Sequence, residues 1–83
     1  MKYQMRIEIK LKSGHSDPEG ETTARLLREL GYKVASVSVS KVYRVALEAP
    51  SCKQAQVKSE EICRRLLANP TKDDFVIAAE ERR

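Results

Sequence analysis

The amino-terminal stretch restricts the fold more than any other part of this sequence, because apolar and polar residues alternate strictly over residues 3–11. Successive side chains of a β-strand point to opposite faces, so the alternation predicts a strand with one buried and one wet face. The residues expected on the buried face are Tyr3, Met5, Ile7, Ile9 and Leu11. Such a strand fits a sheet that is covered on one side only.

A helix is predicted after the polar loop at residues 13–16. Asp17 is placed as its N-cap, Pro18 occupies the first helical position, and Gly31 closes it in the left-handed conformation. Its expected inner stripe consists of Thr23, Ala24, Leu26, Leu27 and Leu30.

Two further strands are predicted at residues 33–40 and 42–49, with Tyr43, Val45 and Leu47 facing inward in the second. The junction at Ser40-Lys41 is short enough for a hairpin, although it lacks the Asn-Gly or Gly that such turns usually contain.

The second helix is expected to begin after Ser51, which can cap it, and to end near Ala68, because Pro70 cannot continue a helix. Its apolar side is predicted to include Ile62, Cys63 and Leu66, and the final strand to place Phe75, Ile77 and Ala79 on the core.

The order β-α-β-β-α-β predicts an α+β fold of the ferredoxin-like type. In this arrangement a four-stranded antiparallel sheet carries two helices on one face, as a single domain over residues 1–83. The strand at residues 33–40 would be an edge strand, and from residue 34 to 40 it contains no charge and no proline. Its free hydrogen-bonding groups are therefore poorly protected, and pairing with another subunit or a packed sheet would cover them.

The chain length favours an oligomer. A chain of 9.4 kDa buries roughly 63% of its unfolded surface, which is marginal for a domain on its own. We expect a homodimer or a tetramer.

The two cysteines, Cys52 and Cys63, lie too far apart along one helix to bond, which indicates reduced thiols and a cytoplasmic location. No apolar run is long enough to cross a membrane. The net charge of +4 comes from basic residues interleaved with acidic ones, a pattern that does not favour nucleic-acid binding.

Residues with catalytic chemistry are few. His15 is the only histidine and has no evident partner. The sequence contains no metal-binding or phosphate-binding motif, and a solvated turn explains Asp73-Asp74 better than a cation site. We therefore expect no catalytic residue, cofactor or metal in this chain, and we interpret it as a subunit or adaptor.

Two motifs resemble a known family. Cys-Arg-Arg-Leu-Leu-Ala-Asn-Pro at residues 63–70, followed by Asp-Asp-Phe at 73–75, resembles the carboxy-terminal signature of the PurS family. Leu11-Lys12 followed by Asp-Pro-Glu-Gly at residues 17–20 is similar to a second family motif. The resemblance covers nearly the whole chain.

The resemblance implies a small subunit of phosphoribosylformylglycinamidine synthase, an enzyme of purine biosynthesis. In that family a glutaminase subunit (PurQ) releases ammonia from glutamine, and a synthetase subunit (PurL) uses the ammonia with ATP and Mg. The small subunit, as a dimer, bridges them and assists ammonia transfer without catalytic residues of its own.

The candidate partner or dimer contacts are Leu67, Asn69, Pro70, Asp74 and Lys41. An equally weighted interpretation is that the first four only end the helix and orient the last strand. At Lys41 the chain departs from the family, which usually has Gly-Lys-aromatic where this sequence has Ser40-Lys41-Val42. The alternative functions are an ACT-like domain that binds amino acids and, third, an RNA-binding module, although three of the four aromatic residues are expected in the core.

Overall fold

The structure is a computed structural model that describes the backbone of residues 1–82 and the side chains of residues 1–80. Three strands and two helices follow one another along the chain, and the second helix ends in a π-helical turn. The elements are β1 (Lys2–Leu11), α1 (Pro18–Glu29), β2 (Lys41–Glu48), α2 (Cys52–Ile62), η1 (Cys63–Leu67) and β3 (Asp73–Arg82).

The sheet is antiparallel with the order β2-β1-β3, so β1 is its central strand. Ile7, at the middle of β1, is paired with Tyr43 on one side and with Ile77 on the other. The predicted alternation is confirmed for Tyr3, Met5, Ile7 and Ile9, which are all buried, whereas Leu11 at the end of the strand is half-buried. The α+β class is confirmed as well, with two helices and an antiparallel sheet.

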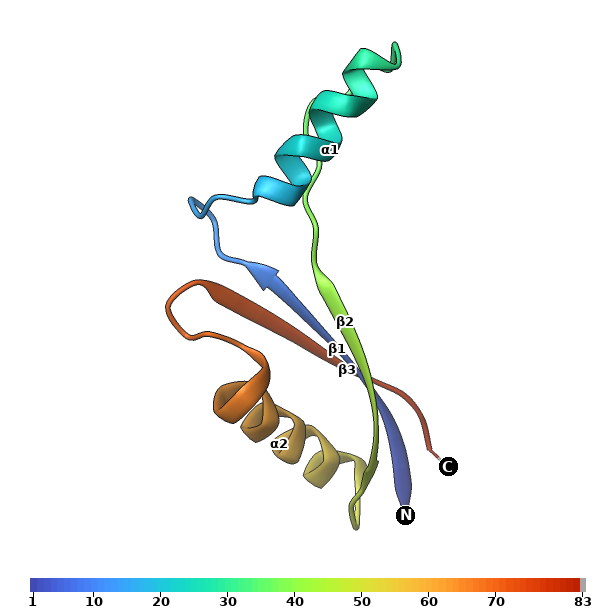
Figure 1. Cartoon of the computed structure of the whole chain (residues 1–83). Helices are drawn as coiled ribbons and strands as arrows, with labels where there is room; N and C mark the ends of the chain where they lie inside the picture. Colours follow the sequence, from blue (N-terminus) through green and yellow to red (C-terminus); the bar gives the residue numbers. More distant parts are fainter. Residues whose placement is uncertain (83) are drawn as a thin grey trace.

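The core lies between this sheet and α2 (Figure 1). Near the start of α2, Ala55 packs with Tyr3 and Met5. At the other end, Cys63 and Ala68 pack with Ile7 and Ile9, and half-buried side chains from β2, β3 and η1 close the cluster. We call the sheet, α2 and η1 the body of the molecule.

The predicted strand at residues 33–40 forms no pair with another strand in the described part of the chain, so the sheet has three strands instead of four. The segment runs straight into β2 without a turn (Figure 1). The physical reason is local: Ser40-Lys41 offers no residue suited to a tight hairpin, and the inward positions of β2 continue the alternation of Val37 and Val39.

The predicted placement of both helices on one sheet face is also wrong for α1. This helix stands beyond the end of the sheet with residues 33–40 running alongside it (Figure 1). The molecule is correspondingly elongated, with extents of 51 × 27 × 14 Å. We call α1 and residues 30–40 the arm.

Local signals at the ends of the helices are confirmed. Asp17 caps α1 by accepting a hydrogen bond from the Gly20 N–H at 3.0 Å. Ser51 caps α2 by accepting one from the Gln54 N–H at 3.2 Å. Gly31 has a φ of +100°, the left-handed conformation expected where a helix ends.

Candidate partner-binding surface

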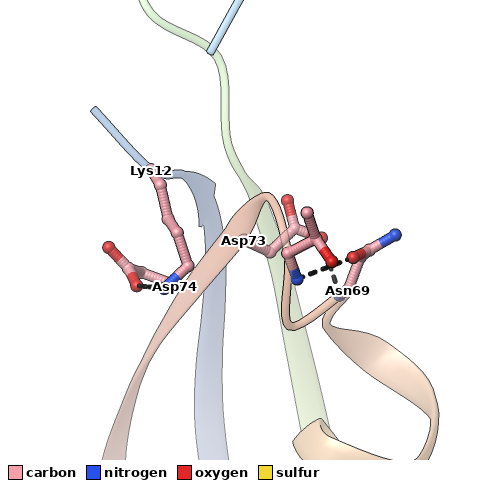
Figure 2. A network of polar contacts seen from close by, with 5 residues as sticks. Lys12, Asn69, Asp73 and Asp74 are labelled. Atoms are coloured by element: carbon pink, nitrogen blue, oxygen red, sulfur yellow. Dashed lines mark hydrogen bonds and ion pairs between the residues drawn. The ribbon is translucent and has the colours of Figure 1, made fainter. Parts of the chain in front are cut away.

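The turn between η1 and β3 holds Asn69 and Pro70 and is stabilised by its own residues. The Asn69 N–H donates to Asp73 Oδ2 at 3.0 Å, and Asn69 Oδ1 accepts from the Thr71 N–H at 2.9 Å (Figure 2). The Asp73 N–H returns a bond to the Asn69 carbonyl at 2.8 Å. Asn69 is therefore occupied within the turn, whereas Pro70 is exposed beside it.

Asp74 makes a separate contact with Lys12, the residue that follows β1. Its Oδ1 lies 3.2 Å from Lys12 Nζ, apart from the Asn69–Asp73 contacts (Figure 2). The Lys12 N–H also donates to the Lys72 carbonyl at 2.7 Å. These two contacts fasten the start of β3 to the segment that leaves β1.

Lys41 and Leu67 both line a hollow that lies between the body and the amino-terminal end of α1. The hollow has a volume of about 220 Å³ and is also lined by Asp17, Val39 and Asp73. Of the five predicted contact residues, the structure thus brings Lys41 and Leu67 together. Asn69 and Pro70 lie in the adjoining turn, and Asp74 pairs with Lys12.

We call Asp17 and Gly20, which join α1 to the extended segment, the root of the arm. The sequence predicted Asp17 as the N-cap of α1 but neither of the contacts with the extended segment. One carboxylate oxygen of Asp17 caps α1, and the other accepts from the Val39 N–H at 2.9 Å. The hydrogen bonds from Gly20 and Val39 lower the pKa of Asp17 below its ordinary value of 3.8. At Gly20 any Cβ would collide with the Val37 carbonyl oxygen, so the helix approaches the extended segment closely because this residue is glycine.

The prediction that Leu66 lies on the apolar side of α2 is wrong. The Ala68 N–H bonds to the Cys63 carbonyl, five residues back, at 2.9 Å. This π-helical turn contains one residue more than an α-helical turn. The side chains after Cys63 are therefore shifted by one position, so that Leu67 is half-buried and Leu66 is 80% exposed. The Leu-Leu pair was the only sequence signal, and it does not say which leucine faces inward.

The remaining chemically reactive side chains, two cysteines and a histidine, lie on different elements of the chain. Cys63 is buried, as predicted, and burial raises the pKa of its thiol, whereas Cys52 is exposed. His15 is exposed in the loop before α1. Within residues 1–82 no group of three or more His, Cys, Asp or Glu side chains could hold a metal ion, and none of the helices there has the length and apolar character needed to span a bilayer.

Comparison with known proteins places the chain in a family. The model of the PurS family, described as phosphoribosylformylglycinamidine (FGAM) synthase, matches residues 4–81. The chain is 45% identical over 76 residues to the synthase subunit PurS of Archaeoglobus fulgidus, covering 90% of this chain and 95% of that one. The chain belongs to the PurS family.

Solved structures support the assignment. The crystal structure of Methanocaldococcus jannaschii PurS, a subunit of formylglycinamide ribonucleotide amidotransferase, superposes with a TM-score of 0.87 and 34% identity over 98% of this chain and 99% of that one. A chain of the PurLQS structure from Thermotoga maritima superposes with a TM-score of 0.88 and 28% identity over 95% and 98%. This chain is therefore similar over nearly its whole length to PurS subunits of FGAM synthase, in purine biosynthesis.

The two family motifs now have structural roles in this PurS-family chain. Residues 17–20 form the root of the arm through the two hydrogen bonds of Asp17 and the close approach at Gly20. Residues 63–70 form the π-helical turn and the bend that leads into β3. The motif at residues 17–20 thus holds α1 against the extended segment, and the motif at residues 63–70 sets how α2 ends and how the chain enters β3.

Proposed function

We propose that this chain is a non-catalytic subunit of FGAM synthase that bridges the glutaminase and the synthetase and assists the transfer of ammonia between them. ATP and Mg are then used by the synthetase. The observation that carries the proposal is its likeness, over 95% of its length, to a chain of the PurLQS structure. The family model and the curated relatives agree, and they do not favour the amino-acid-binding alternative. The free cysteines fit the reducing cytoplasm as its location.

A reconstitution assay tests this function. The synthetase and glutaminase of the same organism are mixed with and without this chain, and amidine formation is followed with either glutamine or ammonia as the nitrogen source. Turnover with glutamine should require the chain, whereas turnover with added ammonia should not. Glutamine-dependent turnover that is indifferent to the chain would reject the bridging function.

We further propose that the chain acts as a homodimer or larger oligomer in which a second copy completes the sheet. The free edge of β2 is where the ferredoxin-like order places its fourth strand. Residues 33–40 of the same chain continue straight into β2 and do not fold back onto this edge. The same segment of a neighbouring copy can take that place, which is an exchange of identical elements between protomers.

The side chains of the arm support this arrangement. Leu26 and Leu30 are 48% and 73% exposed, one helical turn apart, and Tyr32 beyond them is 63% exposed. An apolar surface of this kind on a small helix indicates a partner. Arg28 holds the returning chain against α1 by donating to the Val34 and Ala35 carbonyls at 2.9 Å, so the segment leaves the helix in a fixed direction.

Sedimentation equilibrium of the Leu26→Ser variant tests the second copy. The substitution should raise the self-dissociation constant by about tenfold or more, because it removes buried apolar area at the interface. Val57→Ser is the matched control, since Val57 is 42% exposed on α2, away from the arm. Equal self-association of both variants and the parent chain would contradict the role of the arm.

A further inference from the structure

The arm is held together by contacts of its own, between α1 and the extended segment at residues 33–40. At the start of the helix, Asp17 accepts hydrogen bonds from the Gly20 N–H and from the Val39 N–H of the segment. At Gly20 the helix lies directly against the segment, with no room for a Cβ. In the last turn of the helix, Arg28 donates to the carbonyls of residues 34 and 35. Because these contacts lie at both ends of α1, the helix and the segment form one rigid unit.

The arm and the body, by contrast, share little packing. In the described part of the chain, no residue of the arm belongs to either buried cluster between the sheet and α2. Figure 1 shows α1 standing clear of the sheet. Within residues 1–80 a single side-chain hydrogen bond joins the two units, from Ser40 Oγ to Glu8 Oε2 at 2.7 Å, and it lies at the surface. Units that are joined without a large apolar interface are expected to move relative to each other.

The chain passes between the arm and the body at two places. The first is the loop of residues 13–16, which is exposed and contains Gly14 with a φ of +89°. The second is the junction of Ser40 and Lys41, where the unpaired segment becomes β2. Hinges are commonly built from a few residues of this kind, in loops or at the ends of elements, because such residues absorb rotations of the backbone.

Two hollows flank the junction and give the arm room to tilt. The hollow lined by Lys41 and Leu67, of about 220 Å³, lies on the α2 side of the sheet. A second hollow, of about 260 Å³, is lined by Glu8 and Lys10, which point away from α2 because the side chains of a strand alternate between its faces. Ser40 lines both hollows. Close-packed side chains resist displacement, whereas here space is left open on both sides of the junction.

We propose that the arm is a rigid lever that pivots on the body at residues 13–16 and at the Ser40–Lys41 junction, with the Ser40–Glu8 hydrogen bond as its latch. A second copy seated on the arm, as proposed above, then changes its orientation relative to the body when the arm tilts. The inference rests on that second copy only for what the lever carries, because the pivot is a property of a single chain.

Residual dipolar couplings of the backbone amides test the pivot in the full chain. In a weakly aligned sample, one alignment tensor describes a rigid molecule, whereas two units in relative motion on the microsecond to millisecond timescale need two tensors of different magnitude. We expect the couplings of residues 18–40 to fit one tensor and those of the body to fit another of different magnitude. A single tensor that fits all the couplings within experimental error would overturn the pivot.

Ser40→Ala tests the latch, with Ser38→Ala as the matched control. Ser38 is exposed in the same segment and makes no side-chain hydrogen bond within residues 1–80. Ser40→Ala should increase the difference between the two tensors, because it removes the side-chain hydrogen bond that joins the arm to Glu8. Ser38→Ala should leave the difference at the value of the parent chain. The same result for both variants would overturn the latch.

The native mass of the same sample separates this inference from the second copy. If the chain is a monomer and its couplings require two tensors, the pivot is supported and the second copy is rejected. If the chain is an oligomer and a single tensor fits, the second copy is supported and the pivot is overturned.

Discussion

The arm and the body follow the same local rules but differ in what covers their apolar side chains. In the body, the alternation of β1 faces α2, and Met5 and Ile7 have no exposed surface. In the arm, α1 is capped as regularly as α2, yet Ala24 and Gly20 are its only buried residues. The difference shows that capping and periodicity specify an element, whereas its stability depends on a partner surface. The body contains that surface, and we propose that the arm obtains it from a second copy.

The largest expected effect separates the two regions by their contribution to stability. Ile7→Ala removes a fully buried side chain from the central strand and should lower the free energy of unfolding by about 3 kcal/mol. Leu26→Ala in the arm should change it by about 0.5 kcal/mol or less at dilutions that separate the copies. Denaturant titrations at fixed protein concentration give both values. Equal losses would mean that the arm is part of the same core.

The next effect concerns the root of the arm. Gly20→Ala places a Cβ against the Val37 carbonyl oxygen, and overpacking of this kind costs about 1–3 kcal/mol. Amide exchange should therefore accelerate at residues 34–40 and remain slow in β1. Thr22→Ala, at an exposed position of the same helix, is the control and should change neither. Faster exchange in β1 as well would contradict an arm that loosens independently.

Acid should release the same root. Because the pKa of Asp17 is lowered in the folded chain, its contribution to stability is present above its ordinary value of 3.8. That contribution is lost as the pH falls below 3.8 and through the lowered pKa. The Val39 amide resonance, which reports the bond to Asp17 Oδ2, should titrate in this range. In Asp17→Asn this titration should be missing, and its persistence would assign the transition to another group.

The smallest expected effect is at the Lys12–Asp74 ion pair of the body. Both side chains are substantially exposed, 41% and 54%, so solvent and salt screen their attraction. Lys12→Ala should cost less than about 1 kcal/mol, and the difference from the parent should shrink in concentrated salt. A loss as large as that of Ile7→Ala would show that the turn contributes far more to the body than its exposed contacts indicate.

Features that depend on neighbouring residues could be predicted from the sequence. The alternation over residues 3–9, the caps Asp17 and Ser51, and the left-handed Gly31 were all correct. Each follows from a side chain and a backbone group only a few residues apart, and no distant contact competes with them.

Features that depend on distant contacts were missed. Residues 33–40 have the alternating pattern of a strand, and the only sequence signal against pairing within the chain was the lack of turn residues at Ser40-Lys41. The second hydrogen bond of Asp17 spans 22 residues and has no local signal. Leu66 and Leu67 are identical in type, and the π-helical turn alone decides which faces the core. The candidate contacts gathered only in part for the same reason, since Asp74 forms an ion pair with the distant Lys12.

The native mass of the purified chain, measured by light scattering during size-exclusion chromatography, tests most directly whether a second copy covers the arm. The chain has a mass of 9.4 kDa. We predict a native mass of two or four times this value at micromolar concentration. A folded monomer of 9.4 kDa would contradict the account, because the arm would then be stable without a partner surface.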